Sequence, residues 1–550
     1  MKRLIFISTF LVVAFSGCIN NNKRNNHEFH DKFDIKYPAF SNKQFVITEY
    51  GAVSDGLTLN NEAFAKAIDA CNKAGGGTVI VPKGMWLVSS IIMKSNVNLH
   101  LNKGALILYS SDYDDYELIS TYYEGKQEDR VRPLIYCYEL ENIAITGDGI
   151  IDGTGQIWRQ VKKAKTTESQ WKELISSGGV VEKDGEGWWP TAEAYEASLK
   201  PDYFRSDTLS IKEKEKYKVF FRPQLLQIVN CETVLLEGVT FQNSPAWCIH
   251  PLMTKHLTVK DINVRNPWYA QNGDGIDVES CQYVNIINSR FDVGDDGICM
   301  KSGRDAEGRK RGIPTAYVFI DNCVVYHGHG GFVIGSEMSG GVNNIWVNNC
   351  TFLGTDVGLR FKSTRGRGGV VENIFIKDIR MVNIVRDAII FDLYYNNRGP
   401  ADFIKANLTP EEEVIPQVSE ETPEFRNICF ENIYCNGALR AIQINGLPEM
   451  PLKNLSFKNI IIKAEEGVSI LNNINSSFDN IKVIVKNIPA VQIINSGKLS
   501  ITNFETNLQD KWIEIKGFRT DTIQISGKEI NIKEKVLIDN NINKEKVIIK

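Results

Sequence analysis

The sequence lacks several features that would place it in common functional classes. None of its 11 cysteines falls in a C-x-x-C or Cys/His pattern, so no metal site is indicated and we expect no cofactor. The cysteines are spread singly, so no compact disulfide framework is visible. A formal net charge of -4 gives no overall attraction to nucleic acid or another polyanion. The sequence also contains no apolar run long enough to span a membrane as a helix.

The first residues are typical of an export signal. A basic start precedes an apolar run over residues 4–15, and Ser-Gly-Cys18 follows it. We predict that residues 1–17 are a leader, and Ser-Gly-Cys resembles a bacterial lipobox, which implies lipidation of Cys18. The alternative is an ordinary secretory signal with an incidental cysteine. With residues 18–44 as a polar tether, we expect a monomeric lipoprotein on the periplasmic face of an outer membrane, held there only by its lipid.

Four short segments, which begin near residues 272, 295, 329 and 356, can be aligned by their glycines. Their apolar residues then fall into two columns, Ile276, Ile298, Phe332 and Leu359 in one and Val278, Met300, Ile334 and Phe361 in the other. Such alternation predicts strands with one buried face. Repetition every roughly 22–34 residues predicts an all-β solenoid of stacked coils.

The repeats also predict how the chain is organised. An amphipathic helix over residues 60–74 would cap the first coil, and coils would fill residues 45–500. Residues 501–550 would add terminal strands or an end cap. Two stretches interrupt the rhythm, 156–222 and 396–424, and we interpret them as insertions between coils, the first a folded flap rich in aromatic residues.

A column of small residues precedes the apolar pairs. It could face outward and leave a shallow groove, or it could mark a tight corner that excludes larger side chains. Cys323 and Cys350 each follow an asparagine at one repeat position, which predicts stacked interior thiols. The small residues are Ala246, Gly275, Gly297, Gly331, Gly358, Ala388, Ala441, Gly467 and Ala490.

Acidic residues gather beside the apolar columns. Asp274 and Asp296 occupy the same position in consecutive repeats, and Asp295 aligns with His329. Residues in one position would stack about 5 Å apart, so the three carboxylates would form one cluster. Crowded acids raise one pKa, which supplies a protonated acid and an ionised base together. Taken singly, the Asp pair could be a solvated turn and the histidine a structural one.

Basic and polar residues complete the candidate site. Arg360 and Lys362 alternate outward beside the acidic positions, which favours binding of a carboxylate over a merely solvated face. Asn272 could form a corner ladder or contact a sugar. Lys301 begins a basic loop that ends at Arg311, and this loop could bind an acidic substrate or simply be soluble.

The chain resembles the polygalacturonase family, glycoside hydrolase family 28, over about residues 45–495. The family implies a right-handed parallel β-helix that hydrolyses α-1,4-galacturonide linkages of pectic polysaccharide with inversion. The 21-residue step between the first two acidic motifs also matches. Four motifs carry the resemblance: Asn272-Gly-Asp274, Gly294-Asp-Asp296, Gly328-His-Gly330 and Arg360-Phe-Lys362.

The resemblance also implies a role for each site residue. Asp295 would protonate the leaving oxygen, and Asp274 and Asp296 would hold and deprotonate the water. His329 would tune the acid, and the two cations of the fourth motif would grip the galacturonate carboxylate. Inversion requires a carboxyl separation of roughly 6.5–9.5 Å, which leaves room for the water.

Departures from the family pattern leave the substrate open. Gly273 replaces a common threonine and Gly297 a frequent cysteine or alanine, while Asp296 disfavours a rhamnogalacturonan hydrolase, which typically carries Glu there. Alternatives are a hydrolase of another galacturonate-containing pectin, such as xylogalacturonan or rhamnogalacturonan, a pectate lyase-like enzyme, and a polysaccharide-binding adhesin. The two insertions bracket the motifs, so we expect an exo-acting pocket, with Trp188 and Trp189 as a stacking wall.

Overall fold

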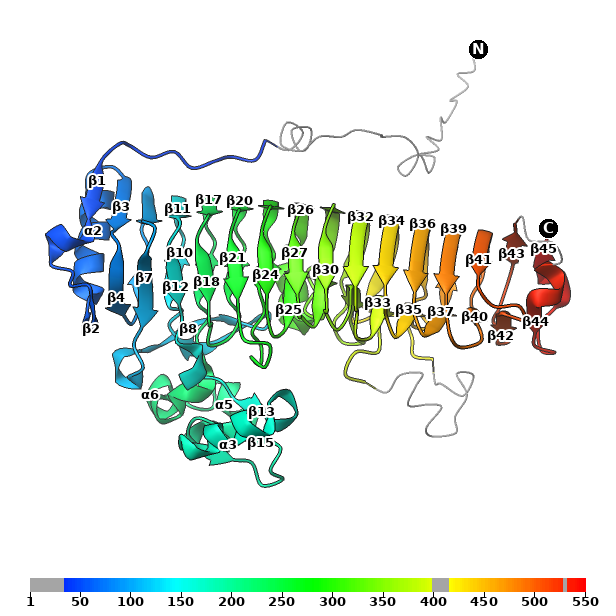
Figure 1. The fold of residues 1–550 in the computed structure, drawn as a ribbon, viewed down its shortest axis with the longest axis horizontal. Helices are drawn as coiled ribbons and strands as arrows, with labels where there is room; N and C mark the ends of the chain where they lie inside the picture. The colour runs from blue at the N-terminus through cyan, green and yellow to red at the C-terminus, as the bar shows by residue number, and fades with distance from the viewer. Residues whose placement is uncertain (1–33, 398–414, 528–531) are drawn as a thin grey trace, which may run out of the picture. The chain divides into compact units, whose positions relative to one another are not determined.

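The structure, a computed structural model, describes residues 34–397, 415–527 and 532–550. The expected leader, Cys18, the tether up to residue 33 and residues 398–414 of the second insertion lie outside this part of the chain. The compact unit Ile35–Lys550 is a stack of coils joined by parallel strand pairing (Figure 1). Within the described ranges, no helix has both the length and the apolar character needed to cross a membrane.

One parallel sheet of 14 strands carries the candidate site. Its strands, in the order of the stack, are β5 (Ile91–Ile92), β10 (Ile135–Tyr138), β16 (Leu226–Val229), β19 (Ile249–Leu252), β22 (Ile276–Glu279), β25 (Asp296–Lys301), β28 (Gly330–Ile334), β31 (Leu359–Lys362), β33 (Asp387–Asp392), β35 (Arg440–Asn445), β37 (Glu466–Leu471), β40 (Val491–Ile494), β42 (Ile513–Lys516) and β44 (Val536–Ile538).

A second, 26-stranded sheet forms the remaining sides of the coils, in two columns that merge in the long strand β32 (Val370–Val382). The first column contains β1 (Gln44–Val46), β3 (Gly77–Val81), β6 (Val97–Leu101), β11 (Glu141–Gly147), β17 (Glu232–Glu237), β20 (Lys255–Lys260), β23 (Gln282–Ile287), β26 (Thr315–Asp321), β29 (Val342–Asn348), β32, β34 (Glu424–Asn436), β36 (Leu452–Lys463), β39 (Ser477–Ile484), β41 (Leu499–Thr506), β43 (Ile523–Ser526) and β45 (Val547–Ile549). The second contains β2 (Asp55–Leu59), β4 (Gly84–Val88), β7 (Ala105–Tyr109), β12 (Ile150–Asp152), β18 (Thr240–Gln242), β21 (Asn263–Arg265), β24 (Arg290–Asp292), β27 (Val324–Tyr326) and β30 (Thr351–Leu353), while β38 (Asn473–Ile474) adds to β36.

The interior of the coils is an apolar ladder, and its register confirms the two predicted columns. Strands β22, β25, β28 and β31 pair so that all eight residues fall where the repeat alignment places them, and all eight are buried. Like side chains stack from coil to coil: the rings of Phe361 and Phe391 lie 4.4 Å apart, and those of Phe430 and Phe457 lie 4.7 Å apart. These separations match the spacing of paired strands. Cys323 and Cys350 are fully buried on adjacent coils, as predicted.

The small-residue column marks a corner. A Cβ built on Gly331 would lie 2.4 Å from the ring of Phe352, so larger side chains are excluded by the interior and no groove forms there. Ala246 was wrongly placed in this column. Strand β19 begins two residues later than the apolar pattern suggests, and Cys248 is the residue that aligns with Gly275.

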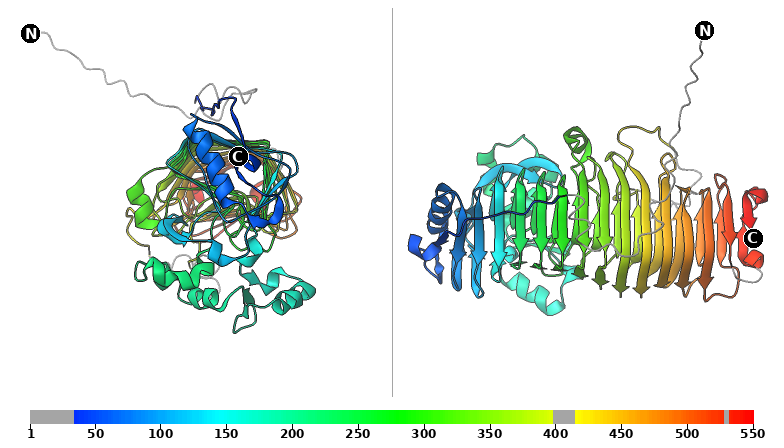
Figure 2. Two further views of the ribbon diagram at one scale, coloured as in Figure 1. Left: turned by 90° about the vertical axis from the view of Figure 1, so that its left-hand side faces the viewer. Right: turned by 90° about the horizontal axis from the view of Figure 1, so that it is seen from above.

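The two ends of the stack differ. Helix α2 (Asn61–Lys73) buries Phe64, Ile68 and Cys71 against the first coil, which confirms the capping helix (Figure 2). At the other end, parallel pairing continues through β44 and β45, so coils extend into residues 501–550.

Several segments project from the coils on the side of the 14-stranded sheet (Figure 1). The antiparallel hairpin of β8 (Leu118–Tyr123) and β9 (Lys126–Val131) leaves between two coils, and α7 (Asp305–Arg311) follows β25. The insertion after β12 folds around a small apolar cluster that includes Trp171 and Trp188. Its elements are β13 (Val161–Lys162), the 3-10 helix η4 (Lys163–Lys165), α3 (Glu168–Ser176), β14 (Val180–Val181), β15 (Gly187–Trp189), α4 (Ala192–Ser198), α5 (Pro201–Arg205), α6 (Ile211–Lys214) and the 3-10 helix η5 (Glu215–Phe221).

Candidate active site

Consecutive coils bring the predicted acidic residues and the histidine together. Asp274 lies just before β22, Asp295 and Asp296 lie at the start of β25, and His329 lies just before β28. The register places Asp274 beside Asp296 and Asp295 beside His329. The strand ladder therefore fixes which groups are neighbours, and loop flexibility has little influence on them.

The three carboxylates form a tight cluster. One oxygen from each of Asp274, Asp295 and Asp296 lies within 4.8 Å of the others. Asp274 and Asp296 are almost fully buried, and Oδ1 of Asp274 accepts no hydrogen bond from the described residues. The 4.8 Å limit refers to the closest oxygen atoms of the three groups. Inverting glycosidases have roughly 6.5–9.5 Å between their two carboxyl groups, which is a larger separation. The stereochemistry of a reaction here therefore needs a direct measurement.

Asp295 lines the cavity, and one of its two oxygens is engaged by the protein. Its Oδ1 lies 3.0 Å from Nδ1 of His329 and accepts a 3.0 Å hydrogen bond from the backbone N–H of Asp296. The main chain is fixed too, because the His329 N–H donates to the Asp295 carbonyl at 2.8 Å. With Oδ1 occupied, Oδ2 is the atom that can carry a proton into the cavity.

Two cations of β31 hold the third carboxylate. Lys362 Nζ lies 2.7 Å from Oδ2 of Asp296, and Arg360 Nη1 lies 3.4 Å from its Oδ1. The ring of Tyr395 packs near both cations. The acidic cluster has a spacing that could ligate a metal ion, but both oxygens of Asp296 already contact cationic side chains. That arrangement favours acid–base chemistry over cation binding.

The electrostatic environment separates the three acids. Burial and neighbouring negative charges raise the pKa of Asp274 well above its usual value. Burial opposes ionisation of Asp295 and Asp296 as well, but other effects outweigh it. His329, ahead of the β31 cations, lowers the pKa of Asp295, and the β31 cations lower that of Asp296. Crowding thus raises one pKa, as expected, but in the free protein it is that of Asp274 and not that of Asp295.

A second charged group, formed by Lys301, Asp277 and Glu337, lies beside the acids, and of its members only Lys301 was singled out from the sequence. Lys301 is buried, and its Nζ contacts Glu337 Oε2 at 2.8 Å and Asp277 Oδ1 at 3.6 Å above the ring of Trp247. Asp277 is fully buried on the outward face of β22, and burial raises its pKa. Strand alternation could have predicted this position, because Asp277 follows the inward-facing Ile276 and must therefore face outward. Nothing in the sequence linked Glu337 to this sheet.

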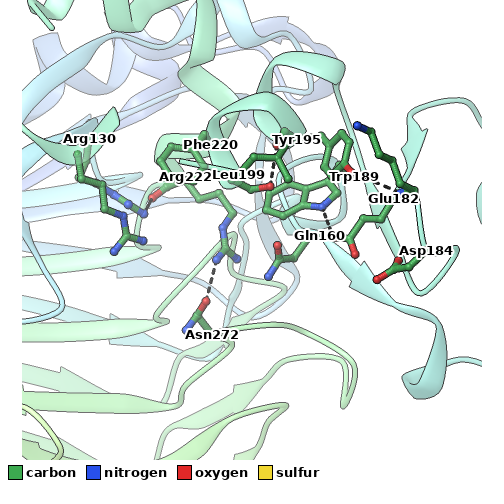
Figure 3. A pocket seen from close by; sticks show the side chains of 13 residues that line it. Arg130, Gln160, Glu182, Asp184, Trp189, Tyr195, Leu199, Phe220, Arg222 and Asn272 are labelled. Atoms are coloured by element: carbon green, nitrogen blue, oxygen red, sulfur yellow. Dashed lines mark hydrogen bonds between the residues drawn. The ribbon is translucent and has the colours of Figure 1, made fainter. Parts of the chain in front are cut away.

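The insertion supplies two contacts that sequence reasoning missed. Arg222, just after η5, donates to the Asn272 side chain at 2.8 Å (Figure 3). Lys165, at the end of η4, places Nζ 3.2 Å from Nε2 of His329. Asn272 therefore lines the site and is held by an arginine, although its backbone has the left-handed φ of a corner residue.

A cavity of about 430 Å³ contains all the predicted acids, cations and the histidine in its lining. The hairpin, the insertion and α7 close it on one side: Glu124 pairs with Arg205 at 2.8 Å and with Arg304 at 3.6 Å. The hairpin tip packs backbone to backbone, since a Cβ on Gly125 would lie 2.7 Å from the Arg304 nitrogen. On another side, Tyr395 and Asn396 line the cavity where the second insertion begins.

The expectation that Trp188 and Trp189 form a wall of the site was wrong. Trp188 packs inside the insertion, and Trp189 lines a separate neighbouring cavity of about 500 Å³, where its indole N–H binds Glu182 (Figure 3). The basic loop contributes less than expected as well. Arg309 and Arg311 are engaged in ion pairs with acidic side chains, and only Lys301 and Arg304 of the loop line the site cavity.

Clustered carboxylates facing an arginine and a lysine, in a cavity on the side of a parallel β-helix, are the groups that hydrolysis of an acidic polysaccharide requires. The chain belongs to Glycosyl hydrolases family 28, whose sequence profile matches residues 166–476. The profile of rhamnogalacturonase A/epimerase, pectate lyase-like proteins matches residues 45–173.

Individual proteins agree with this assignment. A probable polygalacturonase of Vitis vinifera is 26% identical over 76% of this chain and 73% of its own. An exo-poly-α-D-galacturonosidase of Dickeya chrysanthemi is 30% identical over 66% of this chain and 59% of its own. The crystal structure of an exopolygalacturonase from Thermotoga maritima covers 88% of this chain and 96% of its own, with a TM-score of 0.66 and 29% identity.

Proposed function

We propose that this protein is an exo-acting polygalacturonase that hydrolyses α-1,4-galacturonide linkages of pectin. The observation that carries the proposal is the carboxylate cluster held against Arg360 and Lys362 inside a walled cavity. The names of similar proteins agree with it. Membership of a hydrolase family favours this activity over that of a lyase or an adhesin. The predicted site residues line one cavity of this chain, so we propose that a monomer is active.

One shared proton can serve the whole reaction. In the free protein the raised pKa of Asp274 and the lowered pKa of Asp295 favour Asp274 as the residue that carries it. A galacturonate carboxylate bound to the β31 cations offsets the charges that lower the pKa of Asp295, so the proton moves to Asp295. Asp295 Oδ2 then protonates the leaving oxygen as its bond to C1 breaks. Water attacks C1 and yields its proton to Asp274, assisted by Asp296, which restores the starting state.

The product profile from unesterified polygalacturonate tests the activity. We expect mono- or digalacturonate from the first minutes and a slow fall in viscosity, because the hairpin and the first insertion border the cavity and limit it to chain ends. Proton NMR of the first products should show the β-anomer, the result of inversion. Rapid loss of viscosity with mixed oligomers at low conversion would contradict exo action, and unsaturated products that disappear with a chelator would indicate a lyase.

We propose in addition that the mature protein is a lipoprotein anchored at Cys18. The basic start, the apolar run and Ser-Gly-Cys support this, and the asparagine-rich, non-acidic residues after Cys18 favour an outer membrane and its periplasmic face. Mass spectrometry of the mature protein should find a lipidated N-terminal cysteine, and Cys18→Ala should release the protein from membranes. An unmodified N-terminus downstream of Cys18 would disprove the anchor.

A further inference from the structure

A cation from the insertion contacts the histidine of the site. Lys165 Nζ lies 3.2 Å from Nε2 of His329 and 3.5 Å from the Gly294 carbonyl oxygen. On the opposite side of the ring, Nδ1 lies 3.0 Å from Asp295 Oδ1. The carboxylate of Asp356 lies farther away, with Oδ2 3.8 Å from Nε2. The ring is thus between an acid and an ammonium group, with a second acid nearby.

This arrangement determines which ring nitrogen carries the proton. An ammonium group donates and cannot accept, so its contact with His329 uses the lone pair on Nε2. A neutral ring that accepts at Nε2 carries its hydrogen on Nδ1 and donates it to Asp295. A second proton on Nε2 would place two positive charges 3.2 Å apart. Burial lowers the pKa of Lys165, and the carboxylates of Asp295 and Asp356 oppose this effect and favour its charged form.

We propose that Lys165 is a positioning residue that holds His329 as the neutral tautomer with its proton on Nδ1. Without Lys165, the carboxylate of Asp356 would remain 3.8 Å from Nε2, and two flanking carboxylates favour the doubly protonated ring. The resulting imidazolium would hold Asp295 as a carboxylate and reduce its capacity to protonate the leaving oxygen. The insertion would then be part of the catalytic machinery as well as a wall.

Nitrogen NMR of the histidine rings tests the tautomer in the full-length protein. The chain has seven histidines, and a His329→Asn variant assigns the signal. At pH 7, the wild type and Lys165→Arg should show a protonated Nδ1 and an unprotonated Nε2, while Lys165→Met should gain a proton on Nε2. A protonated Nε2 in the wild type, or an unchanged Nε2 in Lys165→Met, would overturn the proposal. The wild-type spectrum alone decides if Lys165→Met does not fold.

A kinetic comparison tests the consequence, and this part rests on the proposed hydrolysis. Lys165→Met should lower kcat about tenfold, part of the typical 10²–10⁴-fold effect of general acid catalysis, with little change in KM. Lys165→Arg should restore most of kcat. Lys163→Met is the matched control, because Lys163 lies on the same 3-10 helix with an exposed side chain. Equal losses in all three variants would overturn the proposal. A wild type inactive on polygalacturonate would refute the proposed function, while the NMR result would still decide the role of Lys165.

Discussion

The substitution Asp295→Asn is expected to lower kcat by about 10²–10⁴-fold while KM changes little. The amide keeps the volume of the carboxyl group, and its oxygen can still accept from His329 Nδ1 and from the Asp296 N–H, as Oδ1 does in the wild type. The amide nitrogen that replaces Oδ2 cannot transfer a proton to the leaving oxygen. The loss should therefore appear in the chemical step and leave substrate binding largely intact.

Asp292→Asn is a suitable control for this experiment. Asp292 ends β24, three residues before Asp295, and its exposed side chain pairs with that of His327 away from the cavity. The control carries the same change of charge and should retain wild-type kcat. Thermal unfolding should remain cooperative in both variants. If Asp295→Asn retains more than a tenth of wild-type kcat, Asp295 is not the acid.

The pH dependence should report on the same residue. The pKa of Asp295 is lowered in the free protein, so this carboxyl is ionised at neutral pH until substrate offsets the β31 cations. The alkaline limb, along which activity falls as Asp295 loses its proton, should therefore appear at higher pH in kcat, which reports the bound state, than in kcat/KM, which reports the free enzyme. Identical alkaline limbs in the two profiles would show that substrate does not redistribute the proton.

The second large effect is expected from Lys362→Ala. Loss of a charged hydrogen bond should weaken transition-state binding of acidic substrates by about 1.5–3 kcal/mol, which corresponds to about 10–150-fold in kcat/KM. The structure adds a further consequence. Lys362 lies 2.7 Å from Asp296 Oδ2 and is the main charge that lowers the pKa of Asp296, so the variant should also lose kcat.

A neutral substrate separates the two roles of Lys362. A glycoside analogue without the carboxylate lacks the binding interaction, so Lys362→Ala should affect its KM much less than that of the acidic substrate. Lys482→Ala serves as control, because Lys482 is an exposed lysine on the distant strand β39. Equal losses on neutral and acidic substrates would show that Lys362 acts only by supporting Asp296.

Sequence reasoning succeeded where a repeating physical rule applies. The columns around Ile276 and Val278 were predictable because a buried strand face repeats every second residue and each coil repeats its predecessor. The same rule placed Asp274 with Asp296. It failed for Ala246, because the pattern does not show where a strand begins relative to its corner.

Residues outside the repeats could not be placed in this way. The hairpin strand Lys126–Val131 is mostly charged and has no apolar period, so nothing in it predicted a wall of the cavity. Lys165 lies in an insertion whose docking depends on tertiary contacts alone. The tryptophans of the same insertion were assigned to the wrong surface, because composition shows that aromatic side chains pack but does not show against which partner.

The parallel strand pairing beneath the site fixes the spacing between the strands that carry the site residues. The backbone of β31, which carries Arg360, lies two steps of hydrogen bonding from that of β25, through β28, each step about 4.8 Å, and this spacing depends little on side-chain volume. Conservative changes in ring size inside the coils should therefore leave the positions of the charged groups nearly unchanged. A single-residue deletion within β25 should instead disrupt the site, because it shifts the register by one residue and turns the outward side chains inward. We therefore expect insertions and deletions to be tolerated in the turns between strands and to disrupt the site when they fall within the strands.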